Sequence, residues 1–399
     1  MIELGYQLSY YLNQILRKHN SNYERRAFDS NYCVFSYSEL QKITKLNLDC
    51  ISDITGIENI TNLKELFIQN KFLENTNLNY SEETNYPYNS FRDFSNIENL
   101  ENLETLCITD NMFIRKLDLK KLQKLKKLII FNTPNLIYLK NLECLKNLET
   151  VIICGTSIKN PIDYSKYINN TKKCKENLLD IQLYPHLKNY NTKRSNVRFV
   201  ERVGQFDFVI LTKQKVDTLF LYCTQIIKKM NLLKLSREKQ VELIYKYIIN
   251  YVRFDYSGLK RRYTRIKNNP NTLVTMKNGF GMLHSSYNAL IRGKSNCEGY
   301  VNLMKFMLNI LGINSYNVHC KLKRHEKINT NNHSIIKIEY DGKVGYCDPS
   351  LEQIENNDYF FKTAQQISRT HYLSLFEEIN IRENMGVNYN DNNYCKHIK

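Results

Sequence analysis

The sequence predicts an α/β solenoid of short repeated strands in its first half, followed by an α+β domain. Two patterns lead to this fold class. A Leu-x-x-Leu-x-Ile motif recurs at nearly constant steps between residues 39 and 160. In the second half, a Cys at the start of a predicted apolar helix precedes a predicted hairpin that carries a His and an Asp. The length of 399 residues also exceeds that of one ordinary domain.

The N-terminal segment, residues 1–20, is predicted to form a short amphipathic helix rather than a signal peptide. Glu3 is acidic where a leader would be basic, and polar residues interrupt the apolar positions. No run of 18 apolar residues follows, so no membrane span is expected. The 11 Cys residues form no CxxC pair, which fits a reducing cytoplasm rather than a disulfide framework. Export without a cleaved leader stays open.

The repeated motif defines five predicted strands. The steps between the middle residues of successive motifs are 20, 40, 22 and 23 residues, and the step of 40 fits two units, one of them degenerate across 73–94. Asn70, Asn111 and Asn132 follow three of the strands. The middle residues are Leu46, Leu66, Leu106, Leu128 and Val151. The pattern resembles leucine-rich repeats over about residues 39–160, whereas Leu-rich amphipathic helices would not repeat the Leu-x-Ile alternation.

The flanking positions of each strand should line one face of the sheet, because side chains alternate along a strand. This face begins mixed and polar and ends apolar. Candidate partner-binding residues on it are Phe67, Ile129, Phe131 and Ile152. An exposed apolar surface is normally buried against another part of the protein or a partner. We expect the following domain, rather than a protein partner, to bury the apolar end of this face.

The chain divides into five predicted parts. Residues 1–38 form an N-terminal helical cap, 39–160 the repeats, and 161–235 a connecting and capping segment. Residues 236–375 form the second domain, and 376–399 a C-terminal tail.

Cys297 is the candidate nucleophile. It follows Ser295 and Asn296, either of which can cap a helix, and the apolar face of that helix continues to Leu311. Gly312 is expected to end the helix. A Cys in the first turn meets the positive end of the helix dipole, which favours its thiolate, although a buried inert thiol is the competing interpretation.

A hairpin places His333 and Asp348 on one face. Asp341-Gly342 is a strong two-residue turn signal between alternating strands. With that turn, opposed residues have numbers that sum to 683, so His333 and Asp348 are diagonal neighbours roughly 7–8 Å apart at Cα. We expect Asp348 to orient His333 as the base, while His284, His319 and His325 are rival bases.

Cys297, His333 and Asp348, in that order, resemble the transglutaminase-like, papain-like superfamily. The resemblance covers about residues 236–360. It extends to the run from Ser286 to Tyr300, to Leu311-Gly312-Ile313, and to Asp348-Pro349-Ser350. Relatives often carry Trp-Asn after the His, whereas Ser334 follows here and the chain has no Trp. The resemblance also implies a Trp that helps to form the oxyanion site, for which Tyr256 or Tyr287 is the candidate substitute in this chain.

The resemblance implies a thiol acyl-transfer enzyme that acts on amide or peptide bonds of a protein substrate. Cys297 would attack the carbonyl, His333 would move the proton and Asp348 would hold the imidazole. The acceptor could be water or an amine, so hydrolysis, deamidation and cross-linking all stay open. Neither a cofactor nor a metal is expected, since no calcium-loop pattern is present.

Two other functions compete with this one. In the first alternative, the repeats bind protein and the second domain is catalytically vestigial. The second alternative is nucleic-acid binding, suggested by a net charge of +17. The predicted face of the repeats carries no basic stripe, and an AT-rich coding sequence would also enrich Lys, so the sequence argues against nucleic acid.

Overall fold

The structure, a computed structural model, consists of two compact units. One comprises residues 1–179 with 186–197, and the other comprises 180–185 with 198–399. The described residues are 2–19, 32–49, 51, 53–69, 93–111, 113–158, 174–187, 197–202, 208–258, 284–323 and 333–373.

The first unit begins with a strand, a helix and a second strand. β1 (Ile2–Gly5) precedes α1 (Tyr6–His19), and it pairs antiparallel with β2 (Tyr32–Phe35). The sequence predicts a helix over residues 1–20. Its first residues instead form β1, because their partner strand lies about thirty residues away and leaves no local signal.

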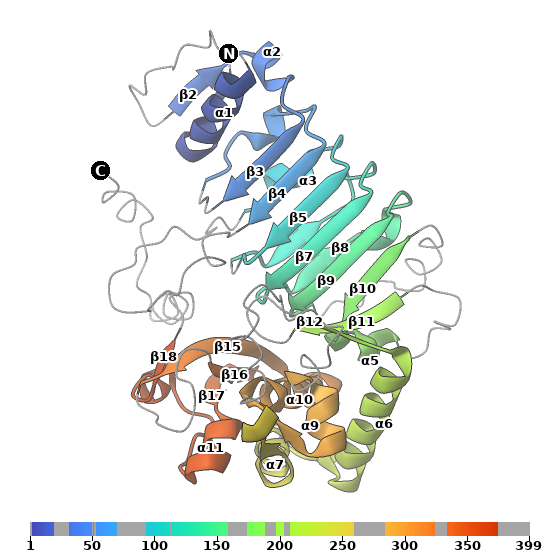
Figure 1. Ribbon diagram of the computed structural model, residues 1–399, viewed down its shortest axis with the longest axis vertical. Coiled ribbons are helices and arrows are strands. Elements are labelled where there is room, and N and C mark those ends of the chain that lie inside the picture. The colour runs from blue at the N-terminus through green and yellow to red at the C-terminus, as the bar shows by residue number, and fades with distance from the viewer. Residues whose placement is uncertain are drawn as a thin grey trace. The chain divides into compact units, whose positions relative to one another are not determined.

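A parallel sheet forms the solenoid of the first unit, in the order β3-β4-β5-β7-β9-β10 (Figure 1). Leu46, Leu66, Leu106, Leu128 and Val151 pair in one row across the sheet. All five side chains are fully buried, which confirms the five predicted strands and the inward direction of their middle residues. The strands are β3 (Lys45–Asp49), β4 (Glu65–Gln69), β5 (Thr105–Thr109), β7 (Lys127–Thr133), β9 (Thr150–Thr156) and β10 (Glu176–Asp180).

Short elements connect these strands. A second pair of parallel strands, β6 and β8, stacks in the same way. The connecting elements are α2 (Tyr37–Leu40), η1 (Ile57–Asn59), α3 (Ser95–Glu98), β6 (Lys116–Asp118), β8 (Tyr138–Lys140) and η3 (Leu142–Cys144).

Asparagine side chains join successive turns of the solenoid. Asn102 donates to Thr61 O at 2.7 Å, and Asn147 donates to Gln123 O at 2.9 Å. Asn132 is buried and donates to Asp110 of the preceding turn. Of the other two Asn residues that follow predicted strands, Asn111 accepts hydrogen bonds from Phe113 N and Ile114 N in its own turn, and Asn70 lies outside the described residues.

The strand β10 is absent from the sequence prediction, which placed it in a connecting segment. It pairs parallel with β9, with Asn177 opposite Val151. An Asn thus occupies the buried row that Leu or Val fills in the other strands. This substitution removes the pattern by which the other strands are recognised.

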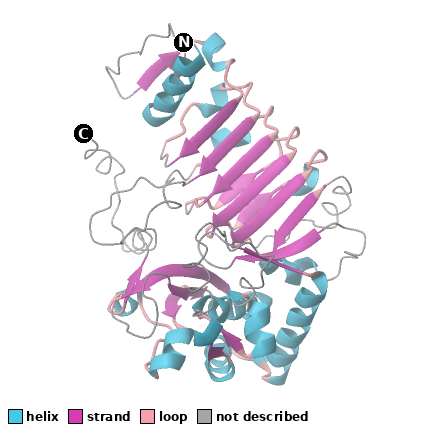
Figure 2. Ribbon diagram, in the orientation of Figure 1, coloured by secondary structure: helices cyan, strands magenta, loops and turns pink. Residues whose placement is uncertain are grey.

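The second unit has helices around a four-stranded antiparallel sheet, in the order β17-β16-β15-β18 (Figure 2). The helix α10 packs on β15 and β16. The elements before α10 are η5 (Ile181–Leu183), α5 (Tyr184–Leu187), β11 (Val197–Arg202), β12 (Phe208–Leu211), α6 (Lys213–Lys229), η7 (Leu232–Lys234), α7 (Arg237–Tyr251), β13 (Arg253–Phe254), α9 (Ser286–Arg292) and β14 (Lys294–Ser295). From α10 on they are α10 (Cys297–Ile310), β15 (Asn314–Leu322), β16 (His333–Tyr340), β17 (Lys343–Cys347), α11 (Pro349–Glu355), α12 (Ala364–Ile367) and β18 (His371–Leu373).

The predicted hairpin is confirmed. β16 and β17 pair with Ile336 opposite Cys347, the register expected from a turn at 341–342. Asp341 and Gly342 have φ angles of 48° and 75°, the left-handed conformations that a two-residue hairpin turn requires. Among the described residues, no helix is long and apolar enough to cross a membrane.

Candidate active site

Cys297 is the first residue of α10, as the sequence predicts. Asn296 is the N-cap, and its side-chain oxygen accepts from Gly299 N. The Asn296 amide nitrogen contacts His284 Nδ1 at 2.5 Å, which holds the capping side chain in place. A Cβ on Gly299 would lie 1.8 Å from Ser295 Oγ, so a glycine is needed two residues after the Cys. The Cys297 side chain is buried, with 7% of its surface exposed.

The backbone before Cys297 is held by two short strands. β14 pairs parallel with β13, and Asp255 N donates to Ser295 O at 2.9 Å. Tyr256 follows β13 with 46% of its surface exposed and packs on Phe254. Tyr287 belongs to α9, where Lys215 lies over its ring.

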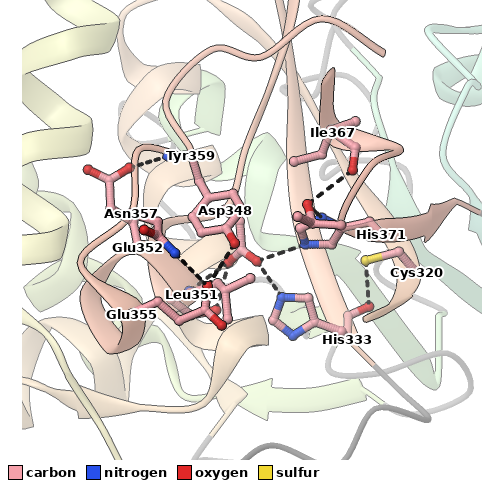
Figure 3. A network of polar contacts seen from close by, with 12 residues as sticks. Cys320, His333, Asp348, Leu351, Glu352, Glu355, Asn357, Tyr359, Ile367 and His371 are labelled. Carbon is pink, nitrogen blue, oxygen red and sulfur yellow. Dashed lines mark hydrogen bonds and ion pairs between the residues drawn. The ribbon is translucent and has the colours of Figure 1, made fainter. Parts of the chain in front are cut away.

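His333 and Asp348 are in direct contact, as the predicted register of the hairpin indicates. His333 begins β16, and its Nε2 lies 2.6 Å from Asp348 Oδ2 (Figure 3). Asp348 lies one residue beyond β17, where it is the N-cap of α11 and accepts from Leu351 N at 2.9 Å. Ser350 Oγ donates to the same Oδ1 at 2.9 Å. Both His333 and Asp348 are almost completely buried.

The second nitrogen of the His333 ring, Nδ1, is not bonded to Asp348. Nδ1 is buried, and it is the ring nitrogen that Asp348 leaves for interaction with Cys297. Burial alone would lower the pKa of His333, but the charges of Asp348 and Cys297 raise that pKa to about 10. Burial would raise the pKa of Asp348, yet His333 and His371 hold it well below its usual range. The pair therefore favours an imidazolium against a carboxylate.

His371, which no sequence motif singled out, also contacts Asp348. His371 begins β18, and its Nε2 lies 3.0 Å from Asp348 Oδ2. Figure 3 shows dashed lines from the Asp348 carboxylate to both imidazole rings. Local sequence gives no sign of this contact, because it depends on β18 pairing with β15.

A second buried network lies beside Cys297 and His333. Ser334 Oγ donates to Glu298 Oε2 at 2.8 Å and lies 3.2 Å from His319 Nδ1. Arg202 contacts His319 Nε2, so this nitrogen must accept and Nδ1 carries the proton. Burial and Arg202 lower the pKa of His319 to about 4.

The contacts of the other histidines favour His333 over them as the candidate base. His319 is neutral and held between Arg202 and Ser334. His284 is bonded to the N-cap residue of α10, and His325 lies outside the described residues. The charge of Cys297 contributes to raising the pKa of His333.

The side chains of His333, Asp348 and His371 are also of the types that bind metal ions. Within the described residues, His333, Asp348 and His371 place one ligand atom each within 4.8 Å of one another. Two ligands of a tetrahedral zinc ion, with bonds of about 2.0 Å, would lie about 3.3 Å apart. The 2.6 Å between His333 Nε2 and Asp348 Oδ2 is shorter than this and fits a hydrogen bond.

The candidate partner-binding residues lie together on one face of the solenoid. Phe67, Ile129, Phe131 and Ile152 are partly exposed, and Lys45 Nζ lies 5.0 Å from the Phe67 ring centre. Ile129 and Ile152 are directly opposed on neighbouring strands. The face therefore offers a row of apolar side chains.

Comparisons with known proteins found distant structural neighbours. No protein-family model matches the sequence, and no curated protein matches it. A solved structure described as a TGase is 19% identical and covers 39% of this chain, with a TM-score of 0.29. An internalin from Listeria monocytogenes is 18% identical and covers 50% of this chain and 68% of its own, with a TM-score of 0.16. The chain spans 37% of the length of the TGase chain that it matches.

Proposed function

We propose that the second unit is a cysteine acyl-transfer enzyme of the transglutaminase-like type that acts on amide or peptide bonds of a protein. The orientation of His333 carries this proposal. Its Nε2 is held by Asp348, which leaves Nδ1 as the nitrogen able to exchange a proton with Cys297. Asp348 keeps the imidazole in this orientation and stabilises its positive charge.

The reaction would proceed through an acyl-enzyme. Before the attack, the Cys297 thiol gives its proton to His333, which forms a thiolate–imidazolium pair. The sulfur then attacks the substrate carbonyl to form a tetrahedral intermediate. The positive end of α10 stabilises the oxyanion. As the carbon–nitrogen bond breaks, His333 returns the proton to the leaving amine. Water or a second amine then releases the acyl group and regenerates the thiol.

A thiol-directed acyl probe tests this assignment. We expect wild-type protein to be labelled at pH 6, because the His333 imidazolium stabilises negative charge on the neighbouring sulfur. Cys297→Ala should lose labelling by about tenfold or more. Cys223→Ala is the matched control, since Cys223 is fully buried in α6 and burial raises the pKa of its thiol. Equal labelling of the wild type and Cys297→Ala would refute the proposal.

A second candidate function is protein binding by the repeats, with vestigial chemistry in the second unit. The row of partly exposed apolar residues on the solenoid supports it, as does the absence of Trp from the whole chain. A protein pulled down equally well by wild type and Cys297→Ala, but not by Phe131→Asp, together with no probe labelling, would favour this function. In the enzyme, the same face would select the protein substrate.

A further inference from the structure

His371 is a buried histidine that the proposed reaction does not use. Its Nε2 lies 3.0 Å from the oxygen of Asp348 that is 2.6 Å from His333. The two rings have centroids 5.7 Å apart and are tilted by 33°. Only 1% of the His371 surface is exposed.

The surrounding structure holds His371 independently of Asp348. β18 pairs antiparallel with β15, with His371 opposite Leu322. Thr370 Oγ1 lies 2.8 Å from His371 Nδ1, and the Tyr359 ring meets the imidazole edge-on at 5.9 Å. The ring is therefore a fixed point against which the carboxylate can be oriented.

The hydrogen bonds around Asp348 leave little freedom to its carboxylate. An ionised carboxylate only accepts, so both imidazoles must present an N–H to Oδ2. Oδ1 accepts from Ser350 Oγ and Leu351 N. Each oxygen thus has two donors, and the two imidazoles compete for the charge on the same atom.

We propose that His371 is a positioning residue that fixes Asp348 and shares its charge, and thereby limits how strongly His333 holds its proton. The inference rests on the proposed role of His333 as the base. The titratable groups facing this cluster from the packed elements are Cys297 on α10, Cys320 on β15, Cys347 on β17, Glu352 on α11, Tyr245 on α7, and Tyr359.

Removing the His371 donor should strengthen the remaining bond. Without it, Asp348 Oδ2 would interact with His333 alone, and the pKa of His333 should rise by about one unit. A more basic imidazole gives a weaker acid, so protonation of the leaving amine should become slower. The Nε2–H proton of His333 should also resonate further downfield.

His371→Leu tests the inference, with His371→Gln as the conservative control that keeps an N–H donor. The readout is the titration and the Nε2–H resonance of His333 in labelled full-length protein, assigned by its loss in His333→Gln. We expect the pKa to rise in His371→Leu and to return towards wild type in His371→Gln. Thr370→Val loosens His371 without touching Asp348 and should shift the pKa in the same direction, by less.

An unchanged His333 titration in folded His371→Leu would overturn the inference. If His371→Leu does not fold, an unchanged titration in Thr370→Val would overturn it. The measurement needs no substrate and no reaction at Cys297. A protein that the acyl probe does not label, yet whose His333 shifts as expected, would refute the proposed function and keep the role of His371.

Discussion

Ser334 Oγ donates a 2.8 Å hydrogen bond to Glu298 Oε2, which joins the residue after His333 to the residue after Cys297. The bond links the start of β16 to the first turn of α10. It is fully buried, and Arg202 and His319 extend it on the far side of Ser334. The two reactive side chains are thus held by backbone segments that are tied together directly.

Ser334→Ala should therefore weaken both stability and reactivity. Glu298 would lose the donor that the described residues offer to its carboxylate, at a cost of about 1–3 kcal/mol in the free energy of unfolding. The rate of Cys297 alkylation should fall, because the distance from Cys297 to His333 is no longer fixed. Denaturant unfolding and alkylation kinetics measure the two effects.

Glu298→Ala, which removes the acceptor, and the double variant complete a thermodynamic cycle for this bond. A coupling energy near zero between positions 298 and 334 would contradict the link.

Stability of the second unit should depend on pH on both sides of neutrality. Between about pH 6.5 and 10, folded His333 keeps a proton that the unfolded chain releases, so stability should fall as the pH rises through this window. Below the ordinary Asp pKa of 3.8, folded Asp348 stays ionised while the unfolded chain takes up a proton. Stability should therefore also fall towards acid pH.

Urea unfolding followed by far-UV circular dichroism across this pH range checks both limbs. In Asp348→Asn, the loss of stability towards acid pH should be smaller, because no carboxylate is left at position 348 to be protonated. The loss of stability towards alkaline pH should also be smaller, because the variant removes the charge that holds the proton on His333. An identical pH profile in this variant would show that other groups cause the dependence.

Leu128→Ala and Ile129→Ala should differ sharply, although they are neighbours on β7. Leu128 is fully buried in the row that stacks between turns, so its truncation should cost about 2–5 kcal/mol. Ile129 lies on the partly exposed face and should cost less than about 1.5 kcal/mol. Circular dichroism is the suitable readout because the chain lacks Trp. Equal losses would contradict the assigned faces.

Local patterns predicted the elements whose signals lie within a few residues of one another. The Leu-x-Ile alternation determines which face of each repeat is buried, and Asp341-Gly342 sets the hairpin register. The hairpin register alone was enough to place His333 beside Asp348. Asn296 before Cys297 likewise predicted the start of α10.

The elements that the sequence did not predict depend on distant pairing. His371 reaches Asp348 only because a three-residue strand pairs with β15, and three residues show no usable periodicity. In β10, Asn177 interrupts the apolar row, so only its pairing with β9 identifies the strand. The role of Ser334 was likewise hidden, since its partner Glu298 is 36 residues away.

Asp348 caps α11 as well as holding His333, so selection for folding alone would preserve it. A related chain without the proposed acyl transfer would still be destabilised by losing the carboxylate, because the first turn of α11 would lose its cap. Cys297 makes no comparable structural contribution as a cap, and Ser or Ala would fit a similar space. In related chains, the residue at position 297 should therefore report whether the proposed reaction is retained. An Asp at position 348 would report only that the fold is retained.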